Sequence, residues 1–259
     1  MPRRTYLVTG AASGIGRATA ARLRDGGHTV IGADLKGADI SADLATPAGR
    51  TELVQRADEL TGGRLDAVIA CAGLAHPDPV TLRVNYFGMV ATLVGLRPLL
   101  AAGTDPRAAL VSSAIAIHPS DPAIVDAALA GDEETAVAAA QAAVDRGEGH
   151  TIYGSSKHAI ARWLRRTAVT EGWADAGIPL NAVAPGTVVT PMTAPLLDDA
   201  AMREVVDASL PMPLNGHARP EQIAPVLAWL TSADNTHVTG QILFVDGGAD
   251  VTLRGDSGW

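Results

Sequence analysis

The chain carries the motif Thr9-Gly10-Ala11-Ala12-Ser13-Gly14-Ile15-Gly16 between an apolar stretch, residues 5–9, and a helical pattern at residues 15–23. Glycines let the chain turn tightly between a strand and a helix, and they let backbone N–H groups approach a pyrophosphate. The partial positive charge at the N-terminus of the helix also attracts the pyrophosphate. The motif therefore predicts a dinucleotide site, and its candidate cofactor-binding residues are Gly10, Ser13, Gly14, Ile15 and Gly16.

Short apolar runs alternate with helical patterns along the rest of the chain. Strands are expected at 5–9, 29–33, 65–70, 108–111, 179–183 and 241–245, and helices at 15–23, 49–60, 80–100, 151–171 and 220–231. This alternation predicts an α/β fold with a doubly wound parallel sheet, a Rossmann fold, covered by helices on both faces. No repeat or linker divides the sequence, so residues 1–259 are interpreted as a single domain.

Composition excludes several classes of protein. The net charge of −8 and the sequence pI near 5.3 argue against a nucleic-acid partner. No stretch is expected to supply the roughly 20 apolar residues of a membrane span. The single cysteine, Cys71, excludes an internal disulfide framework and favours a reducing cytoplasm. The histidines show no ligand spacing with carboxylates, so no catalytic metal is expected.

An acidic residue, Asp34, ends the second expected strand, 18 residues after Gly16. A carboxylate there accepts hydrogen bonds from an adenosine ribose and repels a 2′-phosphate, so NAD is predicted over NADP. Arg17 and Lys36 would soften this preference, and a simple turn residue is the alternative interpretation of Asp34. Three further positions are candidates for contacts with the adenosine: Leu35, Asp43 and Leu44. Helix capping is the alternative role for Asp43.

Tyr153 and Lys157 are one helical turn apart, so they share one face of the expected helix. An ammonium beside a phenol favours the phenolate, and the pKa of Tyr153 is expected to fall below its reference of about 10. Tyr153 would then be a usable general acid and base. The sequence has two lysines and 18 arginines, which indicates a role for Lys157 that arginine does not fill.

With these motifs in place, the chain resembles the short-chain dehydrogenase/reductase family along nearly its whole length. The resemblance rests on segments in the family's order: Thr9–Gly16, Cys71-Ala72-Gly73, Val84-Asn85, Ser112-Ser113, Tyr153 with Lys157, Pro185-Gly186 and Asp246-Gly247-Gly248. The family has asparagine where this chain has Cys71, and a buried, inert thiol is the preferred interpretation of that cysteine.

The resemblance implies a role for each matching position. Ser113 would stabilise the developing charge on a substrate oxygen, and Tyr153 would transfer the proton. Lys157 would hold the nicotinamide ribose and lower the pKa of Tyr153, and Asn85 would carry a water-linked proton relay. The cofactor-binding residues implied by the family are Cys71, Ala72, Gly73, Tyr153, Lys157, Pro185, Gly186, Val188 and Thr190.

A helical insertion before Tyr153, about 119–150, interrupts the alternation, with short helices expected at 121–130 and 132–146. The resulting 40 positions between Ser113 and Tyr153 resemble the bacterial 3α-hydroxysteroid dehydrogenase/carbonyl reductase subgroup. The insertion is either surface decoration or a lid or interface element. By blocking the four-helix subunit interface common in the family, it would favour a homodimer over a tetramer.

The segment at about 187–217 is expected to be a substrate lid, and its apolar residues are Met192, Leu196, Leu197, Met202, Leu210, Met212 and Leu214. His118 and His150, which flank the insertion, are either pocket residues or surface residues. The sequence thus predicts an NAD(H)-dependent oxidoreductase that interconverts a secondary alcohol and a ketone on a small hydrophobic substrate such as a 3α-hydroxysteroid. The alternatives are the same chemistry on a non-steroid ketone or terpenoid alcohol, and a non-catalytic dinucleotide-binding sensor.

Overall fold

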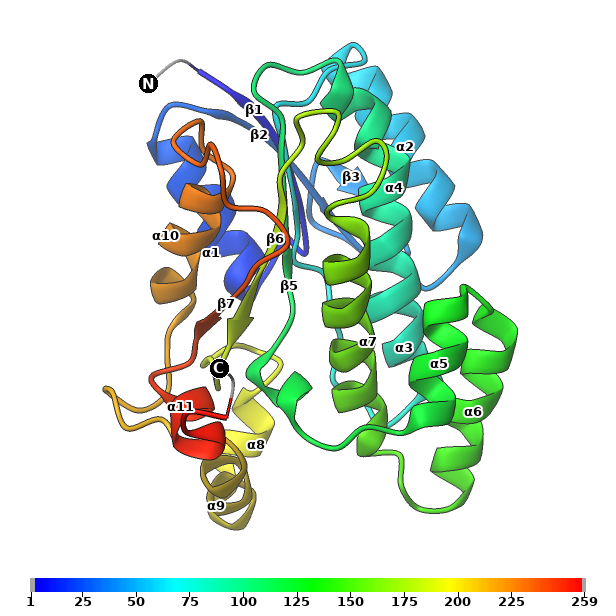
Figure 1. The fold of residues 1–259 in the computed structure, drawn as a ribbon, viewed down its shortest axis with the longest axis vertical. Helices are drawn as coiled ribbons and strands as arrows, with labels where there is room; N and C mark the ends of the chain where they lie inside the picture. Colours follow the sequence, from blue (N-terminus) through cyan, green and yellow to red (C-terminus); the bar gives the residue numbers. More distant parts are fainter. Residues whose placement is uncertain (1–2, 258–259) are drawn as a thin grey trace.

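The computed structural model describes residues 3–257. Within them, a seven-stranded sheet has the order β3-β2-β1-β4-β5-β6-β7, and every pairing between neighbouring strands is parallel (Figure 1). The strands are β1 (Thr5–Thr9), β2 (Thr29–Asp34), β3 (Ile40–Ser41), β4 (Ala67–Ala70), β5 (Arg107–Val111), β6 (Leu180–Pro185) and β7 (Ile242–Val245). The predicted doubly wound α/β fold is confirmed.

Helices cover both faces of the sheet, and each face has its own apolar core. The helices α1 (Gly14–Asp25) and α10 (Pro220–Leu230) lie on one face, and α2 (Pro47–Thr61), α4 (Met89–Ala101) and α7 (Thr151–Thr167) lie on the other (Figure 1). Successive side chains of a strand point to opposite faces. Accordingly, Tyr6 and Val8 of β1 join the first core, whereas Leu7 joins the second.

The strand order reverses between β1 and β4, which are neighbours in the sheet although β2 and β3 separate them in sequence. The last residues of the two strands are paired, Thr9 with Ala70. The segments that follow the two strands therefore leave the sheet side by side. One is the glycine motif after β1, and the other begins at Cys71 after β4. A crevice forms where strand order reverses, at the carboxyl ends of the strands, and ligands of α/β sheets bind there.

The helix expected at 80–100 is one helical run made of three pieces: α3 (Pro79–Leu82), a π-helical turn η1 (Arg83–Gly88) and α4. By length and composition this run could cross a membrane, contrary to the expectation from sequence, but 56% of its most apolar window is buried inside the domain. The side chains of Leu93, Leu96 and Leu100 are fully buried against the sheet. The run is therefore a core helix of this fold.

The insertion forms an antiparallel pair of helices, α5 (Pro122–Ala130) and α6 (Glu133–Asp145), packed against α3 and α7 (Figure 1). Both helices begin at aspartates whose carboxylates accept backbone N–H groups: Asp121 from Ala123 at 2.9 Å and Asp132 from Thr135 at 3.0 Å. Gly131 ends α5 with a φ of 78°. The two predicted helices are confirmed within one residue at each end.

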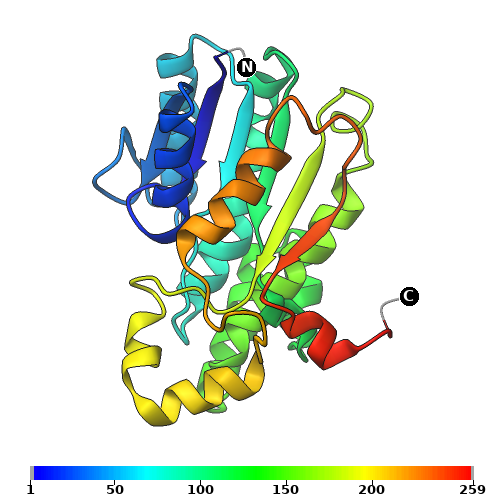
Figure 2. The same ribbon diagram turned by 90° about the vertical axis from the view of Figure 1, so that its left-hand side faces the viewer.

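Some elements differ from the sequence-based expectation. The lid segment contains two helices, α8 (Ala194–Asp198) and α9 (Ala200–Ser209), which lie beyond the carboxyl ends of the strands (Figure 2). None of the side chains of α9 is fully buried, although its apolar residues Met202, Val205 and Val206 recur at helical spacing. The two-residue β3, the short 3₁₀ turn η2 (Ala114–Ile117) and α11 (Ala249–Arg254) were also not predicted. The helix expected at 151–171 ends at Thr167.

Candidate active site

A cavity of about 890 Å³ lies at the carboxyl ends of the strands, where the strand order reverses. Its walls come from the glycine motif, the ends of β2, β4, β5 and β6, one face of α7, and the lid helices. Every predicted cofactor-binding residue lines it: Gly10, Ser13, Gly14, Ile15, Gly16, Asp34, Leu35, Asp43, Leu44, Cys71, Ala72, Gly73, Tyr153, Lys157, Pro185, Gly186, Val188 and Thr190. The fold thus gathers positions from 10 to 190 around one space.

The glycine motif is shaped for close approach to a ligand. Gly10 has a φ of 68°, and a Cβ at Gly16 would lie 2.2 Å from the carbonyl oxygen of Gly10, so neither position tolerates a side chain. Helix α1 starts directly after Ser13, whose side chain does not cap it. The first N–H groups of a helix have no partner within the helix. Those of α1 therefore point to the cavity as donors for an anion such as a pyrophosphate.

The Asp34 carboxylate is held in place at the end of β2. Its Oδ2 accepts the N–H of Ala12 at 3.0 Å, and its Oδ1 accepts the N–H of Leu35 at 2.7 Å. An ionised carboxylate has further lone pairs that can accept a ribose diol. The residues around the cavity therefore fit a nicotinamide dinucleotide, whose pyrophosphate would be held by α1 and whose ribose diol would be held by Asp34.

The helix-capping alternative for Asp43 is wrong. Helix α2 is capped by Thr46, whose Oγ1 accepts the N–H of Gly49 at 3.0 Å. The carboxylate of Asp43 instead accepts the N–H of Ala45 at 2.9 Å and shapes the turn before the helix. The placement of Asp43 and Leu44 at the adenosine stays a prediction.

Three predicted catalytic residues converge on the cavity from two elements. Ser113 follows β5 and begins η2, while Tyr153 and Lys157 lie one turn apart on α7. The Ser113 hydroxyl lies beside the Tyr153 phenol and favours its ionised form. The Lys157 ammonium donates to the carbonyl of Val111, the last residue of β5, at 2.9 Å. Strand β5 and helix α7 are thus tied together where the three groups meet.

Asn85, the fourth predicted catalytic residue, lies behind the cavity wall and is fully buried. Its Oδ1 accepts the N–H of Leu74 at 2.7 Å, and its Nδ2 donates to the carbonyl of Leu74 at 2.8 Å and to Ser156 Oγ at 3.0 Å. These bonds fasten the loop after β4 to η1 and α7. Asn85 therefore acts here on the position of its neighbours, and the predicted proton relay stays a prediction.

The pKa of Tyr153 shifts in the direction opposite to the sequence-based expectation. Burial raises this pKa because the phenolate would lose its hydration, and the Ser113 hydroxyl opposes the increase only in part. The Lys157 ammonium lies 5.8 Å from the centre of the tyrosine ring, directed at the carbonyl of Val111 rather than at the phenol oxygen. The expected decrease assumed a contact that the folded chain does not make.

Burial also shifts the pKa values of two further groups that line the cavity, Lys157 and Cys71. It lowers the pKa of Lys157 to about 8, with the nearby Cys71 acting in the opposite direction. It raises the pKa of Cys71 to about 12, against the charge of Lys157. The thiol is therefore protonated near neutral pH, which agrees with an inert cysteine. Within residues 3–257, no group of three or more His, Cys, Asp or Glu side chains is placed to hold a metal ion.

The outer part of the cavity has an apolar wall on the lid side. The expected Met192, Leu196, Leu197, Met202 and Leu210 line it, together with Val206 of α9, which no motif had indicated. Two expected lid residues do not line it. Leu214 is 68% exposed, and Met212 packs against Gly186, where its sulfur accepts the N–H of Thr187 at 3.2 Å.

The facing rim carries two imidazoles, His150 before α7 and His76 after β4, and sequence reasoning had assigned no pocket role to His76. His118 does not line the cavity. Its Nε2 instead contacts the carbonyl oxygen of Ser209 at 3.0 Å, which ties the start of the insertion to the end of α9.

Comparison with known proteins agrees with this geometry. A family model described as enoyl-(acyl carrier protein) reductase matches residues 10–250. The chain is 33% identical to the 3-alpha-hydroxysteroid dehydrogenase/carbonyl reductase of Comamonas testosteroni, over 96% of this chain and 97% of that protein. It is also 33% identical to the cis-4-hydroxycyclohexanecarboxylate dehydrogenase of Sinomonas cyclohexanicum, over 95% of this chain and 96% of that protein.

A solved structure is similar along its whole length. The crystal structure of the 3-alpha-hydroxysteroid dehydrogenase from Pseudomonas sp. B-0831, complexed with NADH, matches with a TM-score of 0.91 and 38% sequence identity, covering 97% of this chain and 99% of that chain. The chain belongs to the short-chain dehydrogenase/reductase family, the oxidoreductases that act on CH–OH groups. The family membership predicted from the motifs is confirmed.

The lowered pKa of Lys157 leads to a direct test. The chain has two lysines, so protein labelled with ¹³C at lysine Cε gives two resonances, and Lys36→Arg assigns them. We expect the Lys157 resonance to titrate near pH 8, because burial penalises the ammonium. Below that pH the positive charge beside Tyr153 is present, and above it the charge is lost. A Lys157 resonance that titrates at the ordinary lysine value of about 10.4 would contradict this environment.

Proposed function

We propose that this protein interconverts a secondary alcohol and a ketone with NAD(H). The observation that carries the proposal is the convergence of Ser113, Tyr153 and Lys157 on the cavity that the glycine motif also lines. The names of the relatives support it, since two are hydroxysteroid dehydrogenases and one is a hydroxycyclohexanecarboxylate dehydrogenase.

The chain's own residues supply the proton chemistry in this proposal, and the bound dinucleotide supplies the hydride. Ser113 and Tyr153 line the same cavity, so both hydroxyl groups can reach the same substrate oxygen. The raised pKa keeps Tyr153 protonated near neutral pH, which is the state that donates a proton to a ketone oxygen. Alcohol oxidation needs the phenolate, which the neighbouring Ser113 hydroxyl favours.

Asp34 supports NAD as the preferred cofactor. Its carboxylate is fixed by the N–H groups of Ala12 and Leu35 and lines the cavity at the end of β2, where a 2′-phosphate would meet a negative charge. The similar Pseudomonas enzyme was solved with NADH.

A small hydrophobic substrate fits the outer cavity, and we propose a 3α-hydroxysteroid as the first candidate. The wall formed by Leu196, Leu197, Met202 and Val206 is apolar, and Met side chains adapt to varied apolar shapes. A non-steroid cyclic or terpenoid alcohol is the second candidate, favoured by the hydroxycyclohexanecarboxylate dehydrogenase among the relatives. Ser113, Tyr153 and Lys157, here called the catalytic trio, are all present in the cavity. Their presence argues against a non-catalytic dinucleotide-binding sensor.

We also propose a cytoplasmic homodimer. Helices α5 and α6 pack against α7 and α3 and cover a face of α7. A second subunit could not pack on that face while the insertion occupies it. The cytoplasm is proposed from the single thiol, Cys71.

The first experiment measures NADH formation from NAD⁺ with a panel of secondary alcohols headed by a 3α-hydroxysteroid, and ketone reduction in the reverse direction. Tyr153→Phe should lose about 10²- to 10⁴-fold in turnover with nearly unchanged NADH binding, because only the proton-transferring group is removed. Tyr6→Phe is the control, since the Tyr6 hydroxyl bonds to the carbonyl of Thr231, outside the cavity.

Each outcome of the panel has a distinct meaning. Steroid turnover that disappears in Tyr153→Phe supports both the chemistry and the substrate. Turnover of other alcohols alone retains the chemistry and discards the steroid. Full activity in a folded Tyr153→Phe protein overturns the acid–base assignment, and NADH binding without any turnover favours the sensor.

Asp34 is tested by the choice between the two cofactors. Asp34→Ala and Asp34→Asn should each lower the ratio of kcat/KM for NAD⁺ over NADP⁺ by about tenfold or more, because both remove the charge that repels a 2′-phosphate. Asp34→Asn keeps an acceptor for the N–H of Ala12 and so separates charge from loop geometry. A wild-type enzyme that already uses NADPH better than NADH shows that Asp34 does not select NAD.

The oligomeric state is tested by light scattering coupled to size-exclusion chromatography. We expect twice the monomer mass of 26.5 kDa, because α5 and α6 cover α7. A tetramer whose cross-links join α4 and α7 of different subunits would show that the insertion does not block that interface.

A further inference from the structure

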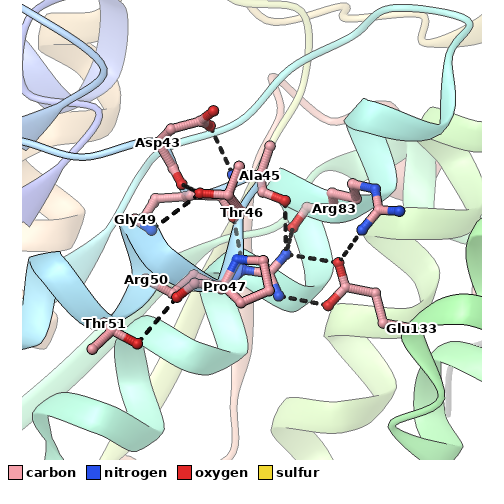
Figure 3. A network of polar contacts seen from close by, with 10 residues as sticks. Asp43, Ala45, Thr46, Pro47, Gly49, Arg50, Thr51, Arg83 and Glu133 are labelled. Atoms are coloured by element: carbon pink, nitrogen blue, oxygen red, sulfur yellow. Dashed lines mark hydrogen bonds and ion pairs between the residues drawn. The ribbon is translucent and has the colours of Figure 1, made fainter.

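Away from the catalytic trio, the insertion is joined to the body of the domain by a network of ion pairs (Figure 3). Glu133 is the first residue of α6. Its carboxylate accepts hydrogen bonds from both terminal nitrogens of Arg50 in α2, at 2.6 and 2.9 Å. Its Oε1 also accepts Nη1 of Arg83, at the start of η1, at 2.7 Å. The Glu133 carboxylate thus bridges three elements that lie far apart in the sequence.

The same Arg50 guanidinium holds the segment before α2. Its Nε donates to the carbonyl of Leu44 at 2.8 Å. Its Nη2 donates to the carbonyls of Ala45 at 3.3 Å and Arg83 at 3.2 Å (Figure 3). Leu44 and Ala45 line the cavity together with Asp43. Arg50 therefore connects the carboxylate of the insertion to the backbone of a cavity wall.

Close packing restricts the movement of residues 43–45, in addition to the hydrogen bonds from Arg50. A Cβ at Gly49 would lie 2.1 Å from the carbonyl oxygen of Asp43, and a Cβ at Gly88 would lie 2.9 Å from that of Leu44. The segment is therefore seated against α2 and η1, and Arg50 binds the carbonyls of Leu44 and Ala45 within it.

Glu133 is the counter-charge that lets Arg50 stay in this place. The Arg50 side chain is only 10% exposed and that of Glu133 is 21% exposed. A buried guanidinium without a partner carries a large desolvation penalty, so its position depends on the carboxylate. Burial raises the pKa of Glu133, but the hydrogen bonds and charges of Arg50 and Arg83 hold it below its usual value. Glu133 is accordingly ionised near neutral pH.

We propose that Glu133 is a positioning residue for the cofactor: through Arg50 it fixes residues 43–45, the wall predicted at the adenosine, so that the insertion sets cofactor affinity. This inference rests on the proposed NAD(H) function. Glu133 touches neither the cavity nor the catalytic trio. Its loss should therefore weaken binding of the dinucleotide and leave the chemical step unchanged.

The test compares Glu133→Gln with Glu134→Gln. Both remove one carboxylate charge from the first turn of α6, but Glu134 is exposed and forms no ion pair within residues 3–257. In Glu133→Gln, the Kd for NADH, followed by its fluorescence, should rise by about 5- to 30-fold, with kcat within twofold of the wild-type value. In the same Glu133→Gln protein, the Kd for 5′-AMP should rise equally, and the Kd for nicotinamide mononucleotide should stay constant. Glu134→Gln should have the wild-type Kd for all three ligands.

A second variant keeps the inference testable if Glu133→Gln does not fold. Arg50→Lys keeps a positive charge for Glu133 but loses the forked contacts with the carbonyls of Leu44 and Ala45, so it should show the same rise for NADH and 5′-AMP. Unchanged Kd values for both ligands in a folded variant overturn the inference, as does a loss confined to kcat or to thermal stability. Failure of the proposed function appears separately, as wild-type protein that does not bind NADH.

Discussion

The site depends on the close approach of Gly16 to the carbonyl of Gly10, where a Cβ would lie 2.2 Å from the oxygen. This contact lets α1 start immediately beyond β1 and directs its first N–H groups to the crevice between β1 and β4. The parallel pairing of these strands ends at Thr9 and Ala70, so the glycine motif and the loop after β4 form adjoining walls of one cavity. A side chain at Gly16 would displace the helix and remove the anion-binding end.

Helix α7 connects this site to the remainder of the domain. Tyr153 and Lys157 face the cavity, whereas the intervening serines bond elsewhere: Ser155 Oγ accepts the N–H of Asp121 at the insertion, and Ser156 Oγ accepts Nδ2 of Asn85. One helix therefore presents its catalytic residues on one side and is held by the insertion and by η1 on the other. The insertion reaches the cavity by two further routes, through His118 to the lid and through Glu133 and Arg50 to residues 43–45.

Much of the fold and of the site could be predicted because the deciding interactions are local. The insertion helices follow from Asp121, Asp132 and Gly131, which act on backbone groups a few residues away. The i,i+4 spacing places Tyr153 and Lys157 on one helical face whatever surrounds them. The lid helix α9 was not predicted although Met202 and Val206 recur at helical spacing, because these side chains line a cavity and are not buried in a core.

Residue order alone therefore determined the parallel α/β sheet, the glycine turn and the family motifs. Apolar periodicity and helix capping depend on residues that are close together in the sequence. Only the tertiary structure decided the electrostatics. Burial of Tyr153 raises its pKa although Lys157 is one turn away, because the chain directs the ammonium to the carbonyl of Val111. The link from Glu133 to Arg50 joins residues 83 positions apart, and desolvation and long-range pairing of this kind depend on the path of the whole chain.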